Sequence, residues 1–195
     1  MMLKEDFKVI REAFLFYDEQ LNSHEFTYTY HNKKTNKKDE FVVLFRKDNF
    51  MHLCGIEYWH INNKGEKKRK IPAKKFYSDL KKERINLNQL FTKEDGSTQQ
   101  KLQVLPSLSL LIKKGVRVTG AGTFYHMRFD KSVRTGKNIV GLTCVSSRSK
   151  YAPQSIINLT SGSKAQSKAF KESHKVVKLE KRNLQTNEKT LLIEE

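Results

Sequence analysis

The chain of 195 residues lacks several features that define common classes of protein. It contains no run of ~18 apolar residues, which a membrane-spanning helix requires. Residues 1–14 mix charged with apolar side chains and have no apolar segment typical of a secretory signal peptide. The two cysteines, Cys54 and Cys144, are too few for a disulfide framework. We therefore expect a cytoplasmic protein in a reducing compartment, with no contact to a membrane.

Acidic residues are scarce in one long stretch of the chain. The whole sequence has 38 Lys and Arg residues against 21 Asp and Glu, which gives a net charge of +17. Residues 113–150 carry nine basic residues and one acidic residue, and residues 31–84 carry sixteen and seven. A basic protein of this size most often binds a polyanion, and a solvated surface that keeps the protein soluble is the alternative. Two basic blocks separated by a neutral stretch predict a positively charged groove if the fold brings them together.

Motifs for metal and nucleotide chemistry are also missing. His52, Cys54 and His60 do not have the spacing of a zinc site. The acid-poor block 113–150 does not supply the carboxylate cluster of a two-metal nuclease. A Walker loop would require glycine where Lys131 stands. Cys54 as a nucleophile would need a positioned histidine, which proximity in sequence does not establish. We expect neither a metal nor another cofactor.

Hydrophobic spacing predicts a helix at the N-terminus and a second one further along. The apolar residues at helical spacing in the first segment are Leu3, Phe7, Ile10, Phe14, Tyr17 and Leu21. Pro72 favours the start of a second helix, with Phe76, Leu80, Leu87 and Leu90 as its apolar stripe. The leucines between residues 102 and 111 predict a third helical segment, which Pro106 begins or kinks.

Strands are predicted where β-branched and aromatic residues gather. Residues 25–30 and 40–45 form one such pair, joined by a basic connection over residues 31–38. Further strands are predicted within residues 116–129, 139–145 and 151–159. Because strands and helices do not alternate regularly, we expect an α+β fold in which N-terminal helices pack on a mainly antiparallel sheet. Residues 1–160 would form one domain, and residues 161–195 a basic polar tail or an added hairpin.

His52 is the histidine whose surroundings best suit acid–base catalysis. It lies in an apolar segment between Phe50 and Cys54, just after the basic residues Arg46 and Lys47. Partial burial beside a basic cluster would bring the pKa of an imidazole near neutrality, as a general acid or base requires. The alternative is a core histidine bonded to a backbone carbonyl.

The segment from Tyr151 to Ser155 is the second candidate for chemistry. It follows a stretch rich in serine that includes Arg148 and Lys150, so hydroxyls and bases gather at the end of a predicted strand. Such groups hold phosphate oxygens in protein–nucleic acid contacts. The alternative is a proline-containing loop that enters a last strand or helix.

These pieces together resemble a known family. The motifs are Phe50-x-His52-Leu53-x-Gly55-Ile56, a central leucine-rich helical stretch, and Tyr151-x-Pro153-x-Ser155-Ile156-Ile157. They are similar to the small nuclease-like domains of phages and other mobile elements that are grouped with the barnase, EndoU, colicin and RelE-like (BECR) fold. The resemblance covers residues 5–160 and implies helices packed on a four-stranded antiparallel sheet and cleavage of RNA without a metal. It maps the family's histidine onto His52 and its late serine onto Ser155, whereas Cys54 stands where relatives more often carry threonine.

The prediction that follows is a metal-independent endoribonuclease of a mobile genetic element, which cleaves RNA through attack of the 2′-hydroxyl. A guide RNA of a CRISPR system is one candidate target. His52 would act as general acid or base, Arg46 would bind the scissile phosphate, and Ser155 and Tyr151 would orient it. Further contacts to RNA are assigned to Lys47, Lys67, Lys68, Arg69, Arg117, Arg128 and Lys150. The alternative is a non-catalytic nucleic-acid binder, or an inhibitor that blocks a protein, with the same basic surface.

Overall fold

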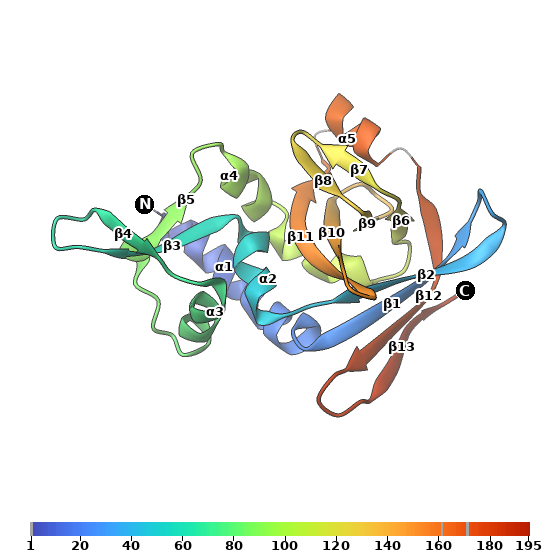
Figure 1. The fold of residues 1–195 in the computed structure, drawn as a ribbon, viewed down its shortest axis with the longest axis horizontal. Helices are drawn as coiled ribbons and strands as arrows, with labels where there is room; N and C mark the ends of the chain where they lie inside the picture. Colours follow the sequence, from blue (N-terminus) through green and yellow to red (C-terminus); the bar gives the residue numbers. More distant parts are fainter. Residues whose placement is uncertain (1, 161, 171) are drawn as a thin grey trace.

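The computed structural model describes residues 2–160, 162–170 and 172–195. It shows an α+β protein with a helix-rich part on the left of Figure 1 and a strand-rich part on the right. This confirms the expected fold class, since the large sheet is mainly antiparallel and the N-terminal helix packs beside it. None of the helices in the described residues has the length and hydropathy to cross a membrane.

The helix-rich part begins with the predicted N-terminal helix. Phe14 and Tyr17 of this helix pack against the rings of Phe50 and Tyr77, edge-on except for the tilted Tyr17–Phe50 pair, and these contacts hold α1 against the helices that follow. The helical elements are α1 (Lys4–Phe16), the π-helical turn η1 (Tyr17–Leu21), α2 (Lys47–Cys54), α3 (Ala73–Lys81), η2 (Leu87–Gln89), α4 (Ser97–Leu102) and η3 (Leu105–Ile112). A small sheet of β3 (Ile56–Ile61), β4 (Lys67–Lys70) and β5 (Leu90–Thr92) lies among them, and its β3–β4 hairpin projects from the molecule (Figure 1).

The strand-rich part is a sheet that closes on itself. Its strands run in the order β1-β2-β11-β10-β9-β6-β12-β13, and β12 also pairs with β1. The strands are β1 (His24–Asn32), β2 (Lys37–Leu44), β6 (Arg117–Thr119), β9 (Lys131–Arg134), β10 (Val140–Ser147), β11 (Lys150–Asn158), β12 (His174–Asn183) and β13 (Lys189–Glu194). The inner face of this ring contributes Phe26, Tyr28, Phe41, Val133 and Leu142 to the main hydrophobic core. All pairings are antiparallel except that of β11 with β2.

A hairpin and a short helix cover part of the outer face of the ring. The hairpin consists of β7 (Gly122–Phe124) and β8 (Met127–Phe129), and the helix is α5 (Lys164–Ala169). They lie next to each other above β9–β11 in Figure 1. A second apolar cluster of Phe129, Ile157, Leu159, Ala169 and Phe170 joins them to the sheet.

The second helix is shorter than its apolar stripe predicts. α3 ends at Lys81, whereas Leu87 lies in η2 and Leu90 in β5. The reason is local, because Glu83 adopts a left-handed conformation with φ of 55° and cannot continue the helix. The connection between the first two strands is also shorter than predicted. Both strands extend into the basic segment and leave a turn over residues 33–36.

The C-terminal segment, expected to be a tail or an added hairpin, contains α5, β12 and β13. β12 pairs along β1 from His24 opposite Asn183 to Tyr30 opposite Val176. Val176, Leu179 and Ile193 from this segment are buried in the main core. β12 is therefore part of the closed ring, and β13 pairs with β12 in a hairpin, which was one of the two expectations for this segment.

Candidate active-site cleft

A cleft of about 770 Å³ opens between the helix-rich part and the outer face of the sheet. One wall is the loop before α4 and α4 itself, the second is the turn of the β7–β8 hairpin, and the floor is the second half of β11. The charged or polar residues that line it are Lys93, Asp95, Ser97, Gln100, Lys101, Tyr125, His126, Ser155, Asn158 and Gln166. Asp95 is the one carboxylate among the described residues of this lining.

The cleft exists because β11 lacks a partner strand along half of one edge. β2 contacts β11 at Tyr151 opposite Val43, and no further bridge is formed along the described part of that edge. Side chains cover the edge instead, since Asn49 Nδ2 donates to the carbonyl of Pro153 at 3.3 Å. The loop opposite is fixed by Thr98, whose hydroxyl donates to the carbonyl of Gly55 at 2.5 Å.

Lys101 is the most perturbed cation of the cleft. Its Nζ donates to the backbone carbonyl of His52 at 2.9 Å. Burial, followed by repulsion from Lys93, lowers the pKa of Lys101 to about 8. The side chain crosses Gly55, where a Cβ would lie only 2.6 Å from Cδ of Lys101. Gly55 also ends α2 with a positive φ of 69°, so glycine serves both the helix end and the path of the lysine.

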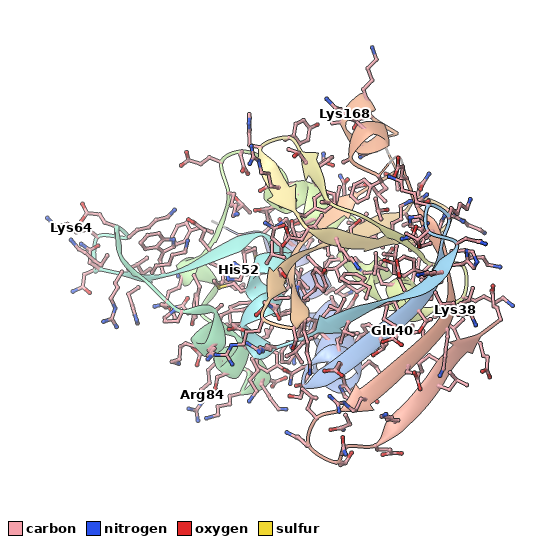
Figure 2. All side chains as sticks on the ribbon, turned by 45° about the vertical axis from the view of Figure 1, so that its right-hand side comes forward. Lys38, Glu40, His52, Lys64, Arg84 and Lys168 are labelled. Carbon is pink, nitrogen blue, oxygen red and sulfur yellow. The ribbon has the colours of Figure 1, made fainter. Side chains whose placement is uncertain are left out.

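His52 lies beside the cleft rather than in the core. Its neighbours Met51 and Leu53 are buried, whereas His52 is on the exposed face of α2, near the centre of Figure 2. Burial of the ring, together with the charges of Lys101 and Lys93, lowers its pKa. A lowered pKa favours the neutral imidazole, which is the form that can accept a proton.

His126 lines the cleft, and the sequence analysis did not select it. It is in the two-residue turn between β7 and β8, after Tyr125, whose φ is 50°. The sequence analysis predicted strands within residues 116–129 without a turn at this point, because neither Tyr125 nor His126 is Gly, Asn or Pro. Gly120 and Gly122 lie before β7 and at its start, so they do not mark the turn at residues 125–126.

The two hydroxyl candidates face opposite sides of the sheet. Alternation along a regular strand would put residues 151 and 155 on the same face. A bulge intervenes, since Thr143 pairs with Ser155 but the next residue, Cys144, pairs with Pro153. Ser155 therefore points toward the cleft, and Tyr151 packs edge-on against Phe41 on the core side.

Arg46 and Lys47 begin α2, and His52 lies near its end. The backbone rise of a helix separates Arg46 from His52 by about 9 Å along the axis. The backbone carbonyl of Arg46 accepts a hydrogen bond from Tyr17 at 2.7 Å, and its N–H donates to Asn49 at 2.8 Å. Both basic side chains are exposed, and neither lines the cleft. Arg46 therefore lies outside the cleft lining that includes Ser155.

The other basic candidates are dispersed. Lys150 pairs with Glu25, which also binds Arg182 at 2.9 Å. Arg128 is exposed on β8, whose neighbouring residue Met127 lines the cleft. Arg117 lies on β6, where it is directly opposite Arg134 of β9.

A family model described as phage-Barnase-EndoU-ColicinE5/D-RelE-like nuclease 4 matches residues 9–195. The chain belongs to this nuclease family. No curated protein and no solved structure matched it. The match confirms the family that the His52 and Tyr151–Ser155 motifs suggested, and it extends through the C-terminal segment that the motifs had left outside.

In this family member, the three remaining basic candidates form a separate surface. Lys67, Lys68 and Arg69 lie on the projecting β3–β4 hairpin, whose tip carries Lys64 at the left edge of Figure 2. Lys67 lies 5.5 Å from the ring centre of Trp59 on the same hairpin. The hairpin thus combines basic and aromatic side chains at a distance from the cleft.

Both cysteines are core residues. Cys54 and Cys144 are free and fully buried. Burial raises the pKa of both thiols, which disfavours the thiolate that a nucleophile requires. The described residues contain no group of three or more His, Cys, Asp or Glu side chains placed to hold a metal ion.

Proposed function

We propose that this nuclease-family protein is a metal-independent endoribonuclease and that the cleft is its active site. The proposal rests on the cleft of about 770 Å³, whose lining includes Lys93, Lys101, His126 and Ser155. Cleavage of RNA by its own 2′-hydroxyl needs a base, an acid and positive charge around phosphorus. The cleft and its margin supply these from lysine and histidine side chains.

The proposed reaction is a transesterification. The 2′-oxygen attacks the adjacent phosphorus while the bond from phosphorus to the 5′-oxygen breaks. The proton of the 2′-hydroxyl passes to a neutral imidazole, and an imidazolium gives a proton to the departing 5′-oxygen. The products are a 2′,3′-cyclic phosphate and a 5′-hydroxyl.

The residues of the cleft take different parts in this scheme. His52 is the proposed base, because its lowered pKa favours the neutral imidazole. His126, on the hairpin turn, is the proposed acid. Protonated Lys101 and Lys93 stabilise the charge that develops on the phosphate oxygens, and the Ser155 hydroxyl orients the phosphate.

The proposed substrate is an RNA whose destruction benefits a mobile element. The family model describes a phage nuclease. A guide RNA of a CRISPR system is our candidate within that class, and a counter-defence role would follow from its cleavage. Parallel digestion of a guide RNA, a transfer RNA and an unstructured RNA tests this preference.

The main experiment incubates the purified chain with RNA of mixed sequence in EDTA. We expect fragments ending in 2′,3′-cyclic phosphate, and a loss of ~10²–10⁴-fold in rate for His126→Ala and for His52→Ala. His60→Ala is the matched control, since His60 is exposed on β3 outside the cleft lining. A His126→Ala protein that cleaves at the wild-type rate would remove His126 from the mechanism. Intact RNA with wild-type protein would refute the nuclease proposal.

A non-catalytic binder is the second candidate, and the β3–β4 hairpin favours it. This hairpin presents Lys67 and Lys70 beside Trp59, an arrangement suited to phosphates and to a stacked base. Such a protein would bind RNA with a steep salt dependence and yield no product. The EDTA experiment separates the two functions directly.

A further inference from the structure

Two arginines lie side by side on the outer face of the sheet. Arg117 of β6 is directly opposite Arg134 of β9. Both donate to the hydroxyl oxygen of Ser173, Arg117 from Nε at 2.8 Å and Arg134 from Nη2 at 2.9 Å. The two guanidinium groups therefore lie close to each other, because both bind the same serine oxygen.

All acceptors of the pair are neutral. Arg117 also donates to the carbonyl of Ser173 at 3.0 Å, and Arg134 donates to the carbonyl of Thr135 at 3.1 Å and to Asn138 at 2.6 Å. Within the described part of the chain, neither arginine forms an ion pair. Glu172, next to Ser173, pairs with Lys34. Two positive charges are thus held close together, and no carboxylate is paired with either of them among the described residues.

One donor of the pair is buried without an acceptor. Nε of Arg134 is inaccessible to solvent and has no hydrogen-bond partner. A buried donor of this kind costs stability, and far more so when it belongs to a charged group. Burial and the nearby Arg117 lower the pKa of Arg134, because both disfavour its positive charge.

A small hollow lies beside Arg134. Its volume is about 100 Å³, and its polar lining consists of Arg134, Asn138 and Gln166. Gln166 of α5 also lines the cleft, so it stands between the two cavities. Arg134 is two strands away from Ile157 on the cleft floor, through Gly141. With strands ~4.8 Å apart and ~3.3 Å per residue, the Arg134 and Ser155 positions are about 12 Å apart.

We propose that Arg117 and Arg134 form a second phosphate subsite, which binds a backbone phosphate of RNA a few nucleotides from the one in the cleft. The guanidinium fork suits the geometry of a phosphodiester, which can accept two parallel hydrogen bonds. The distance and the shared Gln166 place the subsite on a path that continues from the cleft. This inference rests on the proposed function for its substrate class.

The test measures binding of 2′-O-methyl RNA, which cannot be cleaved, as a function of length. Oligonucleotides that fill the cleft alone should bind wild type and Arg134→Gln equally. Longer oligonucleotides should bind the wild-type protein at least ~5-fold more tightly than they bind Arg134→Gln. The slope of log affinity against log salt concentration should also be smaller in the variant by about one, the value expected for one lost phosphate contact. Arg84→Gln is the control, because Arg84 is an exposed arginine near α3, remote from the sheet face in Figure 2.

Two results would overturn the subsite. One is equal affinity of Arg134→Gln and Arg84→Gln at every length, and the other is a loss in Arg134→Gln that is the same for short and long RNA. Arg117→Gln repeats the comparison if the first variant does not fold by circular dichroism. Length-dependent loss of binding without any cleavage by wild type would refute the nuclease proposal and retain the subsite.

Discussion

Lysine side chains lie at both ends of β11, and the fold pairs them differently. At its start, Lys150 binds Glu25, and the same carboxylate binds Arg182 of β12. Toward its other end, Ser155 faces a cleft in which Lys93 and Lys101 form no ion pair among the described residues. The buried carboxylate of Glu25 thus neutralises the cations at one end of β11. The two lysines of the cleft at the other end have no such partner among the described residues.

The difference separates basic residues that support the fold through ion pairs from basic residues that face a cleft. The side chain of Glu25 is only 9% exposed, so the three-residue ion cluster joins β1, β11 and β12 where the ring closes. Such a partly buried network supports the fold, because removal of one partner leaves a charge without compensation. Lys101 has the opposite character, since its burial destabilises its own charge.

Exchanging these lysines for methionine gives the largest contrast that we predict. Lys101→Met should lower kcat/KM for RNA by ~10²-fold, because it removes a cation at the proposed scissile phosphate. Lys150→Met should leave kcat/KM within a factor of two and lower the free energy of unfolding by about 1–2 kcal/mol. Cleavage assays and urea unfolding of both variants measure the two effects. If Lys150→Met loses as much activity as Lys101→Met, the division of β11 into two ends is wrong.

The pH dependence of cleavage should carry the signature of Lys101. Because its pKa is about 8, the ammonium needed for catalysis is lost above that pH. We expect kcat/KM to fall above pH 8 and the decline to move to higher pH in Lys101→Arg, whose charge persists. A decline at an unchanged pH in this variant would assign it to another group.

Stability should change with pH in the opposite direction. The pKa of Lys101 is lowered from 10.5, so between pH 8 and pH 10.5 the unfolded chain holds a proton that the folded chain has released. The free energy of unfolding contributed by this residue therefore rises with pH across that window. Urea unfolding at pH 8 and pH 10 should show the rise in wild type and a smaller one in Lys101→Met.

The smallest predicted effects distinguish the two hydroxyls of β11. Ser155→Ala should reduce kcat/KM by ~10-fold, because it removes one hydrogen bond that an uncharged hydroxyl donates to the phosphate. Tyr151→Phe should change it by less than a factor of two, because the ring lies on the core side of the sheet. Steady-state kinetics on one RNA substrate measures both. A larger effect of Tyr151→Phe would contradict the facing that the bulge imposes.

Local patterns predicted much of the fold. The spacing of apolar residues from Leu3 to Leu21 identified α1 and η1, since one buried stripe specifies a helix wherever it packs. Alternating aromatics identified β1 in the same way. The second helix was predicted, but its end at Lys81 was missed because a single left-handed residue, Glu83, has no hydrophobic signature.

The candidate site was less accessible to sequence. The motifs selected Ser155, which lines the cleft, and His52, which lies beside it. They also grouped Arg46 and Tyr151 with them on proximity alone, and they passed over His126. Sequence neighbours on a helix or strand point in different directions, and residues 126 and 101 come together only when the hairpin and α4 pack on β11.

The sequence by itself determined the α+β class, the excess of basic residues and the motifs of a nuclease family, because each depends on composition or on local spacing. Only the tertiary structure decided which cations are free. Strand pairing brought Glu25 to Lys150, and the bulge at residues 153–155 turned Ser155 toward the cleft. Charge compensation and facing are both set by contacts between distant segments, which no local pattern encodes.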